Sequence, residues 1–388
     1  MVIETYNIQL KMDEAGRVHW LNVLNQSRNA FNRCAELLFE KKTLSLKIAH
    51  SMCYSTVRAE FPCLSSQMAI KCEQAALAAI KSIRSNKHKN VECPYRKALA
   101  MVLDKRLYGK FTAKGIELTG EQKCKRDKVE FVLYPKATEM LLNYKACDPS
   151  IFYRNGEFYL SVPFEVPERP VLSDSCIGVD LGMRQLFVTS EGKSFRDAEY
   201  LGRRRKVRYM KSKLQSKGTK SAKRHLKKLK KHEANQSKDM CYRAAKALIK
   251  STSASIIVME DLSKIKQNTS KNEQGQKRTR HNIALSQVPF YKFKQIMAYK
   301  APLAGKQVET VSPMYTSQTD SRTGKVEGER RGRRFYCKDG IVFDADWNAA
   351  INIGQKSKHP LSSELPLDGT LKPLRGRCLS THQSWKRL

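Results

Sequence analysis

The stretch "IGVDLGMRQLFVTS", residues 177–190, places a carboxylate inside a run that otherwise has the composition of a buried core. Asp180 follows three apolar or glycine residues and precedes Leu181 and Gly182. Burying an unpaired carboxylate costs several kcal/mol unless a partner satisfies it. The pattern therefore predicts a core strand that ends at an acid. It leaves three explanations for the acid: an ion pair, a turn or a metal site.

The net charge indicates a polyanionic partner. The chain has 388 residues, with 73 Lys and Arg against 37 Asp and Glu, which gives a formal charge of +36. Such an excess repels itself, and nucleic acid neutralises it best because each phosphate contact releases counterions. An anionic membrane is the second candidate, but no apolar run reaches the roughly 18 residues that a spanning helix needs. We therefore expect a nucleic-acid-binding protein and no membrane partner.

Two further features indicate the cytosol. The first ten residues, "MVIETYNIQL", alternate like a strand and lack the apolar core of a signal peptide. The 11 cysteines are an odd number scattered through a long chain, as expected of reduced thiols. We expect a cytoplasmic protein.

The first 167 residues predict a small β-barrel that carries a helical insertion. Residues 2–10 have the pattern of a strand, 17–50 show helical spacing, and 65–83 form a second helix capped by Ser65 or Ser66. From about residue 90 the chain turns to short strands, including a hairpin at Asn155-Gly156.

A second domain is predicted to begin near residue 175 with strands at 176–181 and 185–190. It then carries the densest charge run of the chain, residues 203–231, with fifteen Lys or Arg and no acid. A solvated helix face would explain a run of mixed sign, but an unmixed run of this length favours contact with nucleic acid. The predicted contact residues are Arg203, Arg204, Arg205, Lys206, Arg208, Lys211, Lys213, Lys223, Arg224, Lys227 and Lys228.

Three acids lie at the ends of predicted elements. Asp180 ends the first strand of the second domain, Glu260 ends the strand "SIIVME", and Asp346 precedes the helix "WNAAINI". Taken singly, they could be a turn residue, a surface acid and a helix N-cap. Taken together, they predict a site for Mg²⁺ or Mn²⁺, because oxygen ligands suit hard cations. Two such ions about 4 Å apart would support phosphodiester cleavage.

These motifs carry a family resemblance. "IGVDLGMRQLFVTS", "IIVMEDLSKI" and "DADWNAAINI" resemble the three split RuvC motifs of the TnpB family of transposon-encoded RNA-guided nucleases, to which the miniature type V CRISPR effectors are related. "TSQTDSRTG" at 316–324 resembles the segment that precedes the third motif, and the basic stretch 203–250 also fits. The resemblance covers residues 175–354 well.

The resemblance implies a fold and an activity. It implies an α/β chain with an RNase H-like (RuvC) nuclease domain and an N-terminal wedge-type β-barrel with a helical recognition insertion. Asp180, Glu260 and Asp346 would be the metal-binding catalytic acids, with Asp261 and Asp344 ranked below them. The partners would be a guide RNA, derived from a transposon end or a CRISPR array, and double-stranded target DNA in the bacterial cytosol. The guide pairs with one DNA strand beside a short motif that the protein reads.

The sequence leaves open the target-adjacent motif, the structure of the guide and whether the protein acts as a monomer or a homodimer.

The sequence patterns and the family resemblance together predict the domain boundaries. The predicted parts are a wedge-like barrel at 1–10 and 90–167, a helical recognition domain at 11–89, a linker at 168–175, a RuvC domain at 176–310 and 341–354, a degenerate zinc-finger-like insertion at 311–340, and a flexible basic tail at 355–388.

The insertion departs from the family, which usually has two Cys-x-x-Cys pairs there. The first pair is replaced by Asp320 and Thr323, and the second leaves only Cys337. One thiolate cannot build a structural zinc site, which needs four ligands. Cys378 and His359 in the tail show no recognisable pairing. We expect no zinc.

Three rival functions were weighed. An actin-like or sugar-kinase ATPase also opens on a G-x-D-x-G strand. Such an enzyme would need a second glycine-rich phosphate loop, which the sequence does not show, and it would have no need of a charge of +36. An RNA chaperone or transposase accessory would have no reason to keep three acids. A nuclease-dead, RNA-guided repressor is the serious alternative, although the presence of all three acids favours cleavage.

Overall fold

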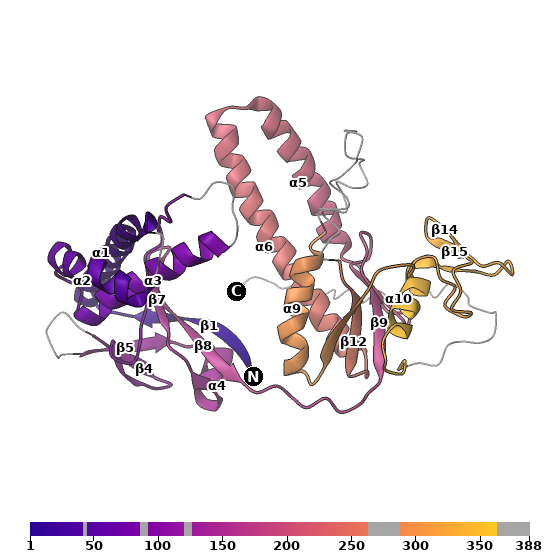
Figure 1. Ribbon diagram of the computed structural model, residues 1–388, viewed down its shortest axis with the longest axis horizontal. Helices are drawn as coiled ribbons and strands as arrows, with labels where there is room; N and C mark the ends of the chain where they lie inside the picture. The colour runs from indigo at the N-terminus through magenta and orange to yellow at the C-terminus, as the bar shows by residue number, and fades with distance from the viewer. Residues whose placement is uncertain (42–44, 86–91, 120–125, 263–287, 363–388) are drawn as a thin grey trace. The chain divides into compact units, whose positions relative to one another are not determined.

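The computed structural model describes residues 1–388 except 42–44, 86–91, 120–125, 263–287 and 363–388. The chain forms two compact units, Met1–Pro167 and Glu168–Leu388. Each is described by itself (Figure 1). The finer division into wedge, recognition and nuclease regions stays a prediction.

Unit 1 is built on an antiparallel sheet of eight strands. The order is β2-β7-β8-β1-β5-β4-β3, with β6 paired to β8. Among the described residues β2 and β3 end the path, so the sheet is a curled half-barrel, and the prediction of a wedge-type barrel is confirmed only in this coarser form. The strands are β1 (Val2–Lys11), β2 (Ala100–Val102), β3 (Tyr108–Phe111), β4 (Gly115–Thr119), β5 (Arg126–Val132), β6 (Lys145–Ala146), β7 (Ser150–Arg154) and β8 (Glu157–Val166).

The predicted hairpin of unit 1 is confirmed. Asn155 and Gly156 join β7 to β8, and both have positive φ angles, 53° and 87°. Two consecutive residues with positive φ make the turn whose twist matches that of the paired strands, and Asn-Gly adopts it readily.

Three helices follow β1 in unit 1. The helical pattern at 17–50 is divided between two of them, α1 (Glu14–Phe39) and α2 (Leu46–Glu60), with Ser45 capping α2. The predicted helix at 65–83 is α3 (Ser66–Ser85), and the Ser65 hydroxyl accepts a hydrogen bond from the Met68 amide. The fourth helix of the unit is α4 (Pro135–Asn143).

Unit 2 contains a five-stranded mixed sheet of order β11-β10-β9-β12-β13. β10 runs antiparallel to β9 and β11, whereas β12 runs parallel to both β9 and β13. The strands are β9 (Cys176–Asp180), β10 (Phe187–Thr189), β11 (Ser194–Phe195), β12 (Ile256–Glu260) and β13 (Gln307–Val311).

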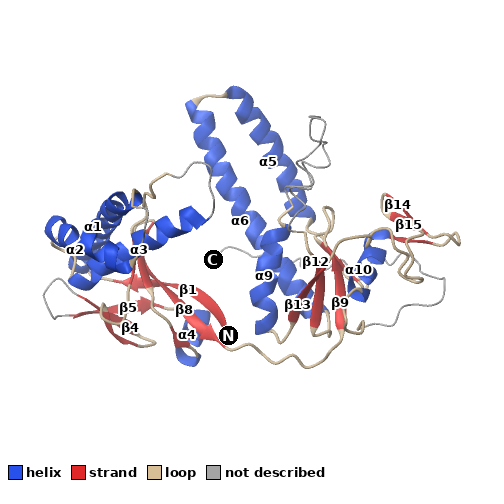
Figure 2. Cartoon of the chain, in the orientation of Figure 1, coloured by secondary structure: helices blue, strands red, loops and turns tan. Residues whose placement is uncertain are grey.

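Both faces of this sheet are covered. Ile177 and Val179 of β9 pack on the side of α6 (Lys220–Ser251) and α9 (Phe290–Leu303). Cys176 of β9 belongs to the opposite face, where it packs against Ile353 of α10 (Ala345–Gln355). Figures 1 and 2 show α10 on one side of β9 and the longer helices on the other.

The basic run predicted at 203–231 forms most of a helical hairpin. It spans α5 (Ala198–Lys217), a turn at Gly218 and the first part of α6, which continues for 32 residues. Gly218 has φ 63°, a left-handed conformation that ends α5 at low cost. Among the described residues, no helix is both long and apolar enough to cross a membrane.

A small antiparallel sheet precedes α10. It consists of β14 (Glu329–Arg331), β15 (Arg334–Tyr336) and β16 (Val342–Asp344). The prediction of a flexible tail from residue 355 is wrong for its first residues: Leu361 forms a bridge with Cys176, and the Ser362 hydroxyl donates to Glu191. The rest of the predicted tail lies outside the described residues.

Two glycines let α10 approach β9 closely. A Cβ atom on Gly178 would lie 1.9 Å from the carbonyl oxygen of Ala350 and 2.4 Å from the amide nitrogen of Gly354. Both neighbours are backbone atoms, which a side-chain rotation cannot move away. The strand and the helix are therefore packed at a separation that requires glycine at position 178.

We predict that Gly178→Ala destabilises unit 2 by about 3 kcal/mol or more, because α10 must move away from β9. Thermal unfolding of the purified variant measures this. Gly202→Ala is the matched control, since a Cβ at Gly202 in α5 meets nothing within 4 Å. That control should be neutral or stabilising, because alanine favours a helix over glycine. Equal unfolding temperatures for Gly178→Ala and the wild type would refute the close contact.

Candidate active site

Two of the predicted acids leave the sheet on the same face. Asp180 ends β9 and Glu260 ends β12, as the sequence predicts. The two strands are parallel, with Val179 opposite Met259, so their final residues emerge side by side. Side chains alternate along a strand, and Asp180 therefore points with Gly178 to the α10 side, as Glu260 does with Val258.

The third acid is in the first turn of α10. The helix begins two residues earlier than the sequence suggests, with Asp344 as its N-cap: the Asp344 carboxylate accepts from the amides of Asp346 and Trp347. Capping is thus the task of Asp344, and Asp346 is free of it. The Trp347 indole donates to the Ser190 carbonyl at 2.9 Å, which fixes this end of α10 beside β10.

Asp261 does not join the group. Its carboxylate lies 3.6 Å from the Lys294 ammonium, and half of its side chain is exposed. Asp261 and Asp344 therefore both have other partners, Lys294 and the first amides of α10.

An arginine of the small sheet lies against the acids. Arg330 on β14 donates a hydrogen bond of 2.6 Å from its guanidinium to the Asp346 carboxylate. Burial raises the pKa of Asp180 and of Glu260, and the positive charge of Arg330 opposes that rise in both. Arg330 is thus a counter-charge shared by all three acids.

The electrostatics show that the acids are close enough to repel one another. The pKa of Asp180 is raised to about 7, first by burial and then by the charges of Glu260 and Asp346. Burial also raises the pKa of Glu260, against the hydrogen bond from Thr316 and the positive charges of Lys356 and Arg330. Mutual repulsion of this kind is typical of carboxylates that share a site.

The donor set fits a hard divalent cation. It consists of carboxylate oxygens from two strand ends and one helix start, and Mg²⁺ and Mn²⁺ prefer such ligands. Within the described part of the chain, no three His, Cys, Asp or Glu side chains are gathered as tightly as bound ligands would be. The raised pKa of Asp180 and the contact of Arg330 with Asp346 both indicate that positive charge is needed there.

The segment that follows β13 reaches into the site. The hydroxyl of Thr316 donates to the Glu260 carboxylate at 2.5 Å, and the side chain of Thr316 is buried. Two asparagines of α10 hold this segment: the Asn348 amide donates to the Thr319 carbonyl, and the Asn352 amide donates to the carbonyls of Thr316 and Thr319. Glu260 is therefore oriented by a loop that α10 fixes.

The predicted nucleic-acid contacts all lie on α5 or α6, but two are paired within the hairpin and a third is partly buried. Arg203 pairs with Glu199, and Lys211 pairs with Glu233 on the facing helix. Arg204 is partly buried, and burial lowers the pKa of its guanidinium. The others are exposed to solvent: Arg205, Lys206, Arg208, Lys213, Lys223, Arg224, Lys227 and Lys228. Whether these bind nucleic acid stays a prediction.

An arginine joins the two turns of the predicted degenerate zinc insertion. The Arg322 guanidinium donates to the buried Asp320 at 2.7 Å and to Asp339 at 2.8 and 3.0 Å. It also lies over the Phe343 ring, 5.0 Å from the centroid. Burial would raise the pKa of Asp320, but the bonds from Arg322 hold it below its usual value. Arg322 thus cross-links residues 320–322 to residues 337–343.

Cys337 lies within this cluster. Burial and the neighbouring Asp320 raise the pKa of its thiol to about 12, so the thiol is protonated at neutral pH. His359 is near another part of the chain, where its carbonyl accepts from the Cys176 thiol at 3.3 Å. Cys378 lies outside the described residues.

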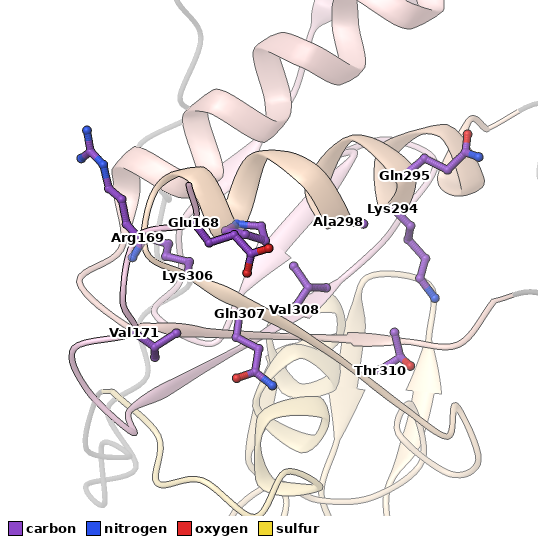
Figure 3. A pocket seen from close by; sticks show the side chains of 11 residues that line it. Glu168, Arg169, Val171, Lys294, Gln295, Ala298, Lys306, Gln307, Val308 and Thr310 are labelled. Atoms are coloured by element: carbon purple, nitrogen blue, oxygen red, sulfur yellow. The ribbon is translucent and has the colours of Figure 1, made fainter. Parts of the chain in front are cut away.

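A cavity of about 560 Å³ lies on the other side of β13 from the sheet centre (Figure 3). Residues of the 168–171 segment, α9 and β13 line it. Lys294 lines it too and donates to the Glu260 carbonyl, but none of the three acids does. The cavity is therefore separate from the acid cluster.

Sequence reasoning missed three residues. Thr316 was noted only as part of a resembling segment, Arg330 is one of several arginines in "GERRGRR", and Arg322 follows the acid that replaces a cysteine. Their partners are distant in sequence, so a local pattern does not single them out. One signal could have been used: Asp320 stands where the family has a zinc-binding cysteine, and an acid at that position indicates that a cation lies nearby.

Comparisons with known proteins agree with these motifs. Residues 290–353 match the family model described as Cas12f1-like, TNB domain. Over 132 residues the chain is 33% identical to the CRISPR-associated endodeoxyribonuclease Cas12f2 of Micrarchaeota archaeon (strain CG1_02_47_40), covering 30% of this chain and 23% of that protein. Over 220 residues it is 28% identical to the putative RNA-guided DNA endonuclease InsQ of Escherichia coli (strain K12), covering 51% and 53%.

The fold has a solved counterpart. The cryo-EM structure of the Cas12f1–sgRNA–target DNA complex matches with a TM-score of 0.60 over 88% of this chain and 83% of that chain, at 14% identity. This likeness shows the fold alone. The predicted resemblance to the TnpB family and its type V relatives is confirmed, although the matched segments span about half or less of the curated relatives.

We predict that Asp180→Asn stabilises the metal-free protein at pH 8. Because the folded-state pKa of Asp180 is above its unfolded value, stability is lost as pH rises from about 4 to about 7. Asparagine removes that loss, so the gain should reach about 2–4 kcal/mol at pH 8 and vanish near pH 4. Chemical unfolding in chelator across this range measures it. Asp261→Asn is the control, and a gain of equal size there would contradict the assignment.

We predict that the purified protein contains zinc well below one equivalent and that a zinc chelator leaves its unfolding temperature unchanged. Elemental analysis and thermal unfolding measure these. Cys337→Ser should be tolerated, whereas Arg322→Ala should destabilise residues 320–345 by about 3–5 kcal/mol, because buried Asp320 loses its partner. Hydrogen exchange over this segment reports the loss.

The matched control for Arg322 is Arg331→Ala, which removes an exposed arginine paired with exposed Glu329 in the same small sheet. It should leave the unfolding temperature nearly unchanged, because an exposed ion pair contributes little to stability. A stoichiometric zinc signal that disappears in Cys337→Ser would show that other ligands complete a metal site.

Proposed function

We propose that this protein is an RNA-guided DNA endonuclease that binds a structured guide RNA, recognises a short target-adjacent motif and cleaves DNA at one metal-dependent RuvC centre. Asp180, Glu260 and Asp346 form that centre. The observation that carries the proposal is the placement of these acids at the ends of β9 and β12 and the start of α10, on one face of the sheet. Burial, together with the charges of Glu260 and Asp346, raises the pKa of Asp180 there.

The sheet of unit 2 supports an RNase H-like nuclease domain. Its first three strands form an antiparallel meander, and β12 and β13 continue in parallel beside β9. The acids occupy the carboxyl ends of the two central strands, where ligand sites of α/β sheets are commonly found. The fold likeness to the Cas12f1 complex is consistent with this arrangement.

The residues of the site have distinct tasks in this proposal. The three carboxylates would hold Mg²⁺ or Mn²⁺, which supplies Lewis acidity and an activated water at a phosphodiester. Thr316 orients Glu260 through its hydroxyl. Asp344 caps α10 and so fixes the direction of Asp346. Arg330 and Lys356 place positive charge beside the acids, where a DNA phosphate would arrive.

The α5–α6 hairpin is the proposed nucleic-acid-binding element. Eight of its basic side chains are exposed, and the run contains no acid before Glu233 to neutralise them. A guide RNA held by its phosphates would explain this excess, since sequence would then be read by base pairing. The relatives named as RNA-guided or CRISPR-associated nucleases support this assignment.

A guide-directed repressor without cleavage is the alternative. It would need the same basic surfaces but no acid cluster. The three acids are present, and each is positioned by structure that serves no other evident purpose, such as the Thr316 bond to Glu260. This observation favours cleavage.

We predict that Asp180→Ala, Glu260→Ala and Asp346→Ala each abolish DNA cleavage by the protein–guide RNA complex, because each removes a metal ligand. Binding of target DNA should persist, since most contacts lie elsewhere. Cleavage of a labelled duplex in Mg²⁺ and gel-shift binding measure the two. Asp261→Asn is the control and should cleave normally. Undiminished cleavage by a variant would remove its residue from the centre.

A combined variant of Lys223, Lys227 and Lys228 to glutamine tests the RNA-binding half in the same experiment. It should bind the guide more weakly and with a shallower dependence on salt, while the acids remain intact. A wild-type complex that binds its target but leaves the DNA uncut in Mg²⁺ and in Mn²⁺ would establish the repressor instead.

A further inference from the structure

An exposed aromatic residue precedes the threonine that contacts the acid cluster. Tyr315 is 56% exposed, and its neighbour Met314 is 62% exposed. The next residue, Thr316, is 3% exposed and donates to Glu260. The chain therefore changes within one residue from a buried contact with the site to a solvent-facing ring.

The backbone of Tyr315 is held in an unfavourable conformation. Its φ is 62°, in the left-handed region that glycine and asparagine adopt but that is a genuine outlier for a bulky residue. Of the described residues, the only other non-glycine with positive φ is Asn155, in the hairpin turn. Strain of this kind persists where the surroundings over-determine it, and such positions gather at functional sites.

The surroundings do over-determine it. The carbonyl of Tyr315 accepts three hydrogen bonds, from the Gln318 amide at 2.9 Å, the Thr319 amide at 3.0 Å and the Thr319 hydroxyl at 2.8 Å. On the other side, the Lys356 ammonium donates to the carbonyls of Ser312 and Met314. The loop is thus tied to α10 at both ends, and the position of the ring follows from it.

Folding alone does not account for a tyrosine there. Glycine would adopt the same φ without strain, and the exposed ring gains little from packing. A ring fixed at an energetic cost and facing solvent next to the acids is suited to contact something that enters the site. Arg330 and Lys356 supply positive charge at the edge of the acid cluster, which the phosphates of an entering nucleic-acid strand can contact.

We propose that Tyr315 stacks on a nucleobase of the single DNA strand whose phosphodiester lies at the three acids, and so positions that strand for cleavage. The inference rests on the proposed nuclease function and adds a positioning residue to it. Every base presents a flat π-face, so such a contact would hold strands of different sequence.

The test uses the protein–guide RNA complex and a single-stranded oligonucleotide substrate. Tyr315→Ala should raise KM about 5- to 100-fold, the range expected from losing one stacked base, with a smaller effect on kcat. Tyr315→Phe and Tyr315→Trp should retain the wild-type KM. Met314→Ala is the matched control, because it removes an equally exposed apolar side chain from the same loop without removing a ring.

Tyr315→Gly separates stacking from folding. It should raise the unfolding temperature by relieving the left-handed backbone, and yet raise KM as Tyr315→Ala does. If the ring served only the fold, Tyr315→Gly would lower the unfolding temperature, and any rise in KM would accompany that loss of stability. Wild-type KM in both Tyr315→Ala and Tyr315→Gly would overturn the proposal.

A binding measurement without cleavage distinguishes the two proposals. In an Asp180→Asn background, an oligonucleotide that carries 2-aminopurine should lose fluorescence on binding the complex, and Tyr315→Ala should restore it. Absence of cleavage by the otherwise wild-type complex would sink the nuclease function. Cleavage with no change in 2-aminopurine fluorescence at any labelled position would sink only the role of Tyr315.

Discussion

The close approach of α10 to β9 is the constraint on which the site depends. Gly178 lies against the backbone of Ala350 and Gly354, so helix and strand are in contact without an intervening side chain. That contact sets the depth at which Asp346 meets Asp180. A larger residue would lift α10 and with it Asn348 and Asn352, which hold the Thr316 loop. One backbone contact therefore governs the third acid and the orientation of the second.

Placing three carboxylates near one another is electrostatically unfavourable, and stabilising contacts elsewhere in the unit compensate for it. Burial and then the charges of Glu260 and Asp346 raise the pKa of Asp180, and packing elsewhere in unit 2 offsets the free energy of this arrangement. The available counter-charges come from outside the sheet, from Arg330 on β14 and Lys356 at the end of α10. A centre built this way favours any cation that arrives, whether a metal ion or a side chain. The fold thus places the three acids and their two counter-charges before any ligand binds.

The sequence predicts the acids better than their surroundings, for a physical reason. Strand ends at Asp180 and Glu260 follow from apolar runs of fixed period, and they are where the sequence places them. The N-cap of α10 cannot be chosen from the sequence: Asp344 and Asp346 are both acids near a helix start, and only geometry shows that Asp344 accepts the amide bonds. The short strands of unit 1 predict a curved antiparallel sheet, but how far it closes depends on the pairing of β2 and β3 and not on local pattern. Long-range polar contacts such as Thr316 with Glu260 leave no periodic signal at all.

The small sheet and the turn before it are joined by charged side chains. Arg322 reaches acids on two turns, one buried and one exposed, and its planar guanidinium bonds both at once, which a lysine could not. Asp320 is buried, so leaving its carboxylate unpaired would be costly, and this cost holds Arg322 in place. The same sheet carries Arg330 on β14 to Asp346. Cohesion of the sheet and the charge balance of the acids are therefore coupled: the ion pairs at Arg322 hold the frame from which Arg330 reaches the site.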